Sequence, residues 1–319
     1  TPNYHANFRV TSENNEETVF SIQGSYGDGA TDNGNYDMAL AYPHGAGNKP
    51  GTCCGFYQPS QSFVNSFKTD ANGLPLIDTY NGSNVTSDEA LLSTDPFTPY
   101  AGDLDPRLDW SVGRRGIPFY DWGIHPGRDW IRQVAYGGPY SPKKNTYYAA
   151  DAGATAGVVG WGWANNALNV TIMRYADVLL MAAEAEIEVG SLDKALEYIN
   201  MVRTRAANSP VKNGAVDAAS YNVGTYATLG TKENARKIVR FERKLELGME
   251  GHRFFDLVRW GIAATEINGL LAVEGVRRSL ALGGASFKPG IHEYFPIPDF
   301  AISQSIVDGQ AQLTQNPGY

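Results

Sequence analysis

Three glutamates spaced four residues apart are the first candidates for chemistry in this sequence. Glu242, Glu246 and Glu250 would form one row on a helix, and neighbouring carboxylates can bind a metal ion or transfer protons. No histidine completes a Glu-x-x-His unit beside them. The flanking arginines are Arg240, Arg243, Arg253 and Arg259. We therefore predict a salt-bridged packing network here, with no catalytic residue.

The remaining polar groups also favour structural roles. Asp105, Arg107 and Asp109 form a short charged motif, which we interpret as a structural ion pair around Arg107. No serine or cysteine nucleophile has an obvious histidine partner. The scattered histidines are His5, His44, His125, His252 and His292.

No metal or cofactor site is predicted. The adjacent Cys53 and Cys54 lack further thiol or imidazole ligands at zinc spacing, which leaves buried thiols or a vicinal disulfide. Asp28, Asp32 and Asp37 lie in a Gly- and Asn-rich stretch, but their spacing does not match a calcium-binding loop. We predict a solvated turn there.

Aromatic side chains are concentrated in irregular sequence between residues 110 and 163, which hold five of the six tryptophans. Rings on loops cannot all enter a helical core, so some should lie on a surface. An exposed ring can stack on the C–H face of a sugar, while neighbouring amides bond its hydroxyls. Trp110 and Trp130 have apolar neighbours and are predicted to pack the loops instead.

We predict that five residues of this region contact a ligand. Trp161 and Trp163 would point to the same side of an extended chain, with Asn165 beside them. Tyr120 and Trp122, in PFYDWGIHPG, are the other two.

Two helices and a tight turn, residues 169–208, are predicted to support these loops. Apolar residues from Ile172 to Ile187 recur at three- and four-residue spacing. Gly190 should close the first helix in a left-handed conformation, and Ser191 should cap the second. The pattern is typical of one tetratricopeptide-like hairpin.

Another helix is predicted after the cap residue Thr231, with Met249 at the end of its buried face and Gly251 as its breaker. After Gly261 we predict an irregular stretch and then a short helical turn at residues 299–304. A β-prone run at residues 18–23 and a short helix after Pro59 are predicted in the first part of the chain.

Several ordered segments resemble the C-terminal region of the SusD/RagB family. They are FSIQ from Phe20, DPRLDW from Asp105, RYADVLLMAAEAEIEVG, YINMVRTRA, RFERKLELGMEGHRFFDLVRWG, YFPIP and the terminal QNPGY. The resemblance implies a mainly α, SusD-like fold of tetratricopeptide-like hairpins with a loop-rich aromatic region. It implies one domain, residues 1–319, lacking the family's N-terminal helical part. Within it we expect a ligand-side region (1–168), a hairpin scaffold (169–268) and an extended C-terminal segment (269–319).

Composition excludes some classes of function. A net charge of −8 disfavours a nucleic-acid binder, which normally carries a basic stripe. No apolar run is long enough to cross a membrane.

The resemblance implies a non-catalytic, cell-surface protein that binds an oligosaccharide or polysaccharide. Such proteins are lipid-anchored in the outer membrane, face outwards, and pass the ligand to a TonB-dependent (SusC-like) transporter. A RagB-type peptide binder on the same scaffold is one alternative. An α-helical glycoside hydrolase using two carboxylates is another.

Overall fold

The computed structural model describes residues 1–29, 40–45, 47–51, 53–159 and 163–319. Its contacts divide the chain into two compact units, Thr1–Gly251 and His252–Tyr319.

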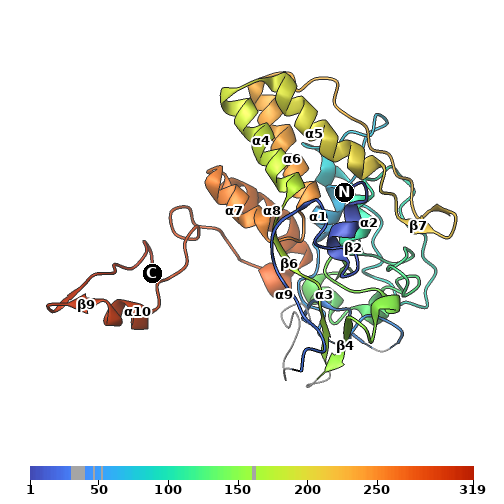
Figure 1. Cartoon of the computed structure of the whole chain (residues 1–319), viewed down its shortest axis with the longest axis horizontal. Coiled ribbons are helices and arrows are strands. Elements are labelled where there is room, and N and C mark those ends of the chain that lie inside the picture. Colours follow the sequence, from blue (N-terminus) through green and yellow to red (C-terminus); the bar gives the residue numbers. More distant parts are fainter. Residues whose placement is uncertain (30–39, 46, 52, 160–162) are drawn as a thin grey trace. The chain divides into compact units, whose positions relative to one another are not determined.

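Three helices form the centre of the first unit. α4 (Tyr175–Val189) and α5 (Leu192–Ala207) are joined by two residues, so they run antiparallel, and α6 (Lys232–Glu246) packs on both (Figure 1). Their shared interior is apolar because the helical spacing places small and branched side chains on the facing sides. The buried members are Ala176, Leu179, Leu180, Ala183, Ile187, Ala195, Ile199, Val202, Ala235, Ile238 and Val239. The predicted pair of helices joined by a tight turn is confirmed.

The predicted N-caps are also confirmed. The Ser191 hydroxyl accepts from the Lys194 N–H, and the Thr231 hydroxyl accepts from the Asn234 N–H at 3.2 Å. Gly190 does end α4, but its φ of −125° is not left-handed, contrary to our prediction. A Cβ there would lie 2.0 Å from Glu186 Oε2, so this flexible carboxylate would have to move.

Two residues lie outside the helices to which we assigned them. Ile172 belongs to strand β6 (Val170–Arg174), which precedes α4, and is exposed. Met249 follows the end of α6 and is half-buried. Both residues fit the apolar spacing, but spacing alone does not locate where a helix begins or ends.

The strands are short and paired in twos. β1 (Thr18–Ile22) pairs with β6 and confirms the predicted β-prone run. The other antiparallel pairs of the first unit are β2 (Val112–Gly113) with β3 (Ser141–Pro142), β4 (Ala156–Val159) with β5 (Trp163–Asn166), and β7 (Lys212–Asn213) with β8 (Val216–Asp217).

The loop-rich part of the first unit is packed around a second core. Its short helices are α1 (Gln61–Asn65), α2 (Arg107–Ser111), α3 (Val134–Gly137), η1 (Tyr4–Phe8), η3 (Tyr80–Gly82), η4 (Arg128–Trp130) and η5 (Ala149–Asp151). Val64 and Phe67 from the α1 region pack with Leu245 of α6, so the loops are tied to the scaffold through apolar contacts. As predicted, α1 follows Pro59, and Trp130 is buried in the loop region.

The second unit contains α7 (His252–Arg259), α8 (Ala263–Arg277), α9 (Ser279–Leu282), α10 (Asp299–Gln304) and the hairpin of β9 (Ile306–Val307) and β10 (Gln310–Ala311). Leu257, Ala263 and Phe287 form its small core. The helical turn at 299–304 is confirmed. The irregular stretch predicted after Gly261 is wrong for residues 263–282, which form α8 and α9, and is confirmed for residues 283–298. The apolar residues of α8 are distributed around the helix and do not form one long stripe, so helical spacing did not mark it in the sequence; they include Ile267, Leu270, Leu271, Val273 and Val276.

The described chain is mainly α with tetratricopeptide-like hairpins, as predicted. The contacts divide it after Gly251, within the scaffold region that we placed at 169–268. The prediction of one domain with internal boundaries at 168 and 268 stays a prediction. Among the described residues, no helix combines the length and apolar character needed to span a bilayer.

Candidate functional site

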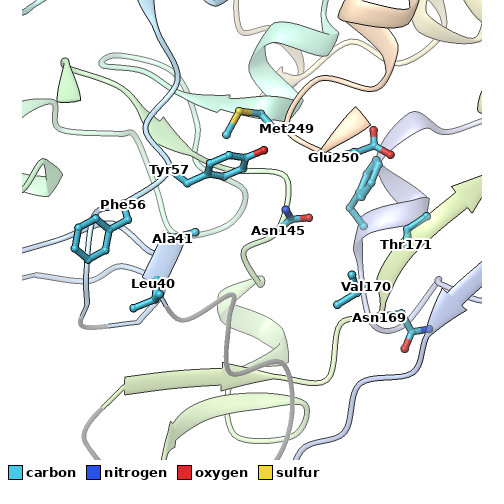
Figure 2. A pocket seen from close by; sticks show the side chains of 12 residues that line it. Leu40, Ala41, Phe56, Tyr57, Asn145, Asn169, Val170, Thr171, Met249 and Glu250 are labelled. Atoms are coloured by element: carbon cyan, nitrogen blue, oxygen red, sulfur yellow. The ribbon is translucent and has the colours of Figure 1, made fainter. Parts of the chain in front are cut away.

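Two hollows of about 350 Å³ each adjoin in the first unit, and both are lined by Phe56 and Tyr57. The first hollow is also lined by Phe8, Leu40, Ala41, Asn145, Asn169, Val170, Thr171, Met249, Glu250 and Gly251 (Figure 2). The second is also lined by Gly55, Gln58, Arg132, Gln133, Tyr136 and Gly137. Phe56 is 49% exposed and Tyr57 54% exposed, so both rings are accessible to a ligand.

The loop that carries this aromatic pair is held by backbone bonds on one side and a helix cap on the other. The Gly55 N–H donates to the Tyr42 carbonyl at 2.9 Å, and the Phe56 N–H donates to the Leu40 carbonyl at 3.0 Å. After the loop, the Ser60 hydroxyl caps α1. The rings are therefore displayed from a fixed backbone, which lowers the entropy lost when a ligand binds.

Unpaired polar groups face the first hollow. In Figure 2 the Tyr57 ring and the Asn145 amide point toward its middle, while the Phe56 ring is turned away. Within the described part of the chain, neither the Tyr57 hydroxyl nor the Asn145 amide has a hydrogen-bond partner. Together they offer donors and acceptors beside an aromatic face.

The facing wall is formed by Met249, Glu250 and Gly251, just beyond α6. Lys144 fixes this wall by donating to the Gly248 carbonyl at 2.7 Å and to Glu250 Oε1 at 2.8 Å. Arg174 pairs with Glu250 Oε2 at 2.8 Å. Burial alone would raise the pKa of Glu250, but the charges of Arg174 and Lys144 hold it below its usual value.

Both walls contain a non-glycine residue with left-handed backbone, Tyr57 at φ 59° and Met249 at φ 68°. This conformation is unfavourable for side chains with a Cβ, and it is found disproportionately at functional sites. The two outliers therefore point to the first hollow independently of its shape.

A buried ion network lies beneath the site. Arg107 pairs with Asp105, Glu242 and Glu246 at 2.6, 2.7 and 2.9 Å. Arg174 and Arg205 also pair with Glu246. The predicted network and the ion pair around Arg107 are confirmed.

The partners within that network differ from those predicted. Its arginines come from α2, from the end of β6 and from α5, whereas Arg243 instead pairs with Asp177 at 2.7 Å. Our prediction used neighbours in sequence, but side chains on one helix face different directions and the row of glutamates faces other elements.

Tyr120 and Trp122, two predicted ligand residues, lie in one loop and are half-buried. The Tyr120 hydroxyl donates to the Lys143 carbonyl at 2.6 Å, and its ring stacks on Tyr148 at 4.4 Å. The Trp122 indole N–H donates to the Tyr147 carbonyl at 2.7 Å. Neither residue lines the two hollows.

Two of the other three predicted residues lie in the β4–β5 hairpin. Trp163 and Asn165 are in β5, where they pair with Val159 and Gly157, and only their backbone is described. Trp161 lies outside the described residues. The ligand role of all five residues stays a prediction.

The sequence did contain a signal for the loop that was missed. In GFYQPS, two aromatics follow a glycine and precede Pro59 and the cap residue Ser60, so they cannot belong to the helix. Asn145 had no such signal.

Cys53 and Cys54 form a vicinal disulfide, one of the two predicted alternatives. The described residues contain no group of three or more His, Cys, Asp or Glu side chains that could hold a metal ion. Asp32 and Asp37 of the predicted turn lie outside them.

Comparison with known proteins shows which family has this sequence pattern and fold. The model of the SusD family matches residues 16–319. A SusD-like protein of Formosa agariphila is 35% identical over 105 residues, which cover 32% of this chain and 20% of that protein.

Solved structures are similar over nearly the whole chain. A SusD superfamily protein from Bacteroides vulgatus aligns with a TM-score of 0.54 and 24% identity, covering 93% of this chain and 51% of that one. Surface glycan-binding protein A from Bacteroides thetaiotaomicron, in complex with laminarihexaose, aligns with a TM-score of 0.53 and 19% identity, covering 99% and 55%. The chain thus spans about half the length of these solved relatives and, in its match, 20% of the curated one.

Because the family model covers nearly all of its length, and the sequence segments that suggested the family lie in their expected order, this chain belongs to the SusD family.

Proposed function

We propose that this chain binds oligosaccharide or polysaccharide chains without breaking them, at the surface formed by the two adjoining hollows. The observation that carries the proposal is the exposed pair Phe56–Tyr57, which is shared by both hollows and accompanied in the first by the side-chain amide of Asn145. Aromatic faces suit the C–H face of sugar rings, and a planar amide can bond neighbouring hydroxyls.

The site suits a chain of several sugars. A ligand crossing the aromatic pair would enter a hollow on either side, so units on both sides would gain contacts. Each stacked ring adds about 0.5–1.5 kcal/mol beyond area burial. Two or three such contacts plus hydrogen bonds correspond to micromolar-to-millimolar binding, roughly 4–8 kcal/mol.

The acidic groups near the site argue against glycoside hydrolysis. A general acid needs a pKa near or above the working pH, whereas ion pairs hold the pKa of Glu246 and Glu250 below their usual values. Both carboxylates are also fully engaged with arginine or lysine. Hence the proposal assigns no catalytic residue.

Membership of the SusD family supports the cellular part of the proposal. The protein would be lipid-anchored at the outer membrane, facing outwards, and would deliver its ligand to a TonB-dependent (SusC-like) transporter. A similarly folded protein is described in complex with laminarihexaose, a glucan oligosaccharide, which supports a glycan ligand.

Native affinity electrophoresis across plant, host and microbial polysaccharides tests the proposal. We expect at least one glycan to retard the chain, and Tyr57→Ala to weaken the retardation roughly tenfold through loss of stacking and shape. Tyr175→Ala is the matched control, since Tyr175 is 48% exposed and lines neither hollow. Trp161→Ala and Trp163→Ala test the residues predicted from the sequence.

Three results would contradict the proposal. Binding of peptides but no glycan would support a RagB-type peptide binder, and turnover of a bound oligosaccharide would establish an enzyme. Glycan binding that survives Tyr57→Ala but is lost in Trp161→Ala or Trp163→Ala would move the site from the two hollows to these tryptophans.

A further inference from the structure

The second hollow contains one charged side chain, Arg132. Its other lining residues are neutral, and no carboxylate lies among them. Across the described ranges of the chain, Arg132 forms no ion pair, although carboxylates outnumber cations in this protein of net charge −8. No acidic side chain of the described residues therefore competes with a ligand for Arg132.

The guanidinium of Arg132 is nevertheless held in place. Its Nη1 donates to the Cys54 carbonyl at 3.2 Å, and its centre lies 4.8 Å from the Phe56 ring. Gly55 allows this approach, because a Cβ there would lie 2.9 Å from Arg132 Cβ. The side chain is thus fixed beside the exposed aromatic pair by a hydrogen bond and a cation–π contact.

Most of the donors of this guanidinium remain available. Arginine carries five N–H donors in a planar fork, and the bond to Cys54 uses one of them. A fork of this geometry matches the two oxygens of a carboxylate or sulfate. Gln133 and Tyr136 line the same hollow, and neither the Gln133 side-chain amide nor the Tyr136 hydroxyl has a hydrogen-bond partner in the described part of the chain.

We infer that the second hollow is an anion subsite, in which Arg132 binds an acidic substituent of a sugar chain while Phe56 and Tyr57 stack on its rings. The ligand is then an acidic glycan that carries uronate carboxylates or sulfate esters. This inference rests on the proposed function and names its substrate class.

Matched pairs of glycans with the same backbone test the inference. A comparison of polygalacturonate with its methyl ester tests binding of uronate carboxylates. A comparison of sulfated with unsulfated laminarin tests binding of sulfate esters. For at least one pair, we expect the acidic member to bind roughly tenfold more tightly, and its affinity to fall with added salt. The pair that shows this difference identifies the anion.

Variants separate the charge from the stacking surface. Arg132→Gln should remove the preference for the acidic member of a pair and change the affinity for the neutral member by no more than about twofold. Arg132→Lys keeps the charge and should retain part of the preference for the acidic member. Tyr57→Ala should weaken the binding of both members of a pair. Arg128→Gln is the control, because Arg128 is also exposed but lines neither hollow. This variant should leave the affinities for the acidic and the neutral member unchanged.

Each result bears on a separate claim. If neutral members bind as tightly as acidic ones, or if Arg132→Gln weakens both equally, the anion subsite is wrong while glycan binding stands. If no member of either pair binds but a neutral glycan of the broader panel does, the subsite is wrong while the proposed function stands, and if no glycan of either set binds, both fail.

Discussion

Glu13, near the wall of the first hollow, shows how the burial of one carboxyl group makes the stability of the fold depend on pH. Its Oε2 accepts a hydrogen bond from the Asn169 N–H at 2.8 Å, and burial raises the pKa of Glu13 to about 7. In the unfolded chain this pKa is about 4.3. The folded state therefore binds the proton more tightly, and this contribution to stability is present below about pH 4.3 and lost as the pH rises through about 7.

Glu13→Gln should remove this dependence, because glutamine keeps an acceptor for Asn169 without a charge. We expect the variant to gain stability over the native protein at about pH 8 and to gain much less at about pH 5.5. Urea denaturation at both pH values measures the difference. An equal effect at the two pH values would contradict the assigned ionisation.

Tyr120 is a second residue whose environment leads to a test. Its hydroxyl donates to the Lys143 carbonyl and lies 2.7 Å from His5 Nε2. Tyr120→Phe should lower the free energy of unfolding by about 1–3 kcal/mol, because it leaves the buried His5 Nε2 without its partner, whereas the Lys143 carbonyl still accepts from Thr146. Tyr136→Phe is the control for urea denaturation, since the exposed Tyr136 hydroxyl has no partner in the described ranges. A loss as small as that of the control would show that the Tyr120 hydroxyl is not held as described.

At the scale of elements, the N-cap of α6 sets where the central helix begins. The Thr231 hydroxyl satisfies the Asn234 N–H, one of the free donors in the first turn. Thr231→Ala should lower the free energy of unfolding by about 1 kcal/mol. Thr231→Ser retains the hydroxyl oxygen, so the free energy of unfolding should fall by less than in Thr231→Ala. Chemical denaturation of both variants checks the cap, and equal losses would point to the methyl group instead.

At the scale of the whole first unit, the buried ion network joins α2, the end of β6, α5 and α6. Glu246 is central to it, because Arg107, Arg174 and Arg205 all pair with this carboxylate. Burial would raise the pKa of Glu246, but the three arginine charges hold it well below its usual value. Its contribution to stability is therefore present above the unfolded pKa, about 4.3, and is lost as the pH falls further.

Glu246→Gln should cost about 3–5 kcal/mol near neutral pH, because three buried arginines lose a shared charge. It should also make the loss of stability on acidification shallower than in the native protein. Glu197→Gln is the control, since its bridge to Lys194 lies on the surface and is worth little. Urea titrations from about pH 7 to about pH 4 measure both effects. An unchanged acid profile in Glu246→Gln would contradict the central role of this carboxylate.

The sequence by itself determined the features that depend on neighbours along the chain. Helical spacing identified the buried faces of α4 and α5, and cap residues located the starts of α5 and α6, because both are governed by contacts within one or two turns. Ordered segments identified the family. The same local reasoning placed Ile172 and Met249 in helices that do not contain them, and it missed α8, which lacks a long apolar stripe.

Only the tertiary structure decided which distant residues meet. Spacing marked Glu246 as part of a buried ionic row, but its arginine partners come from segments 41 to 139 residues away. Likewise, Tyr57, Asn145 and Met249 line one hollow although each lies in a different loop. A loop has no periodicity that fixes its path, so the direction of these side chains depends on the backbone bonds and ion pairs that fold the loops against the scaffold.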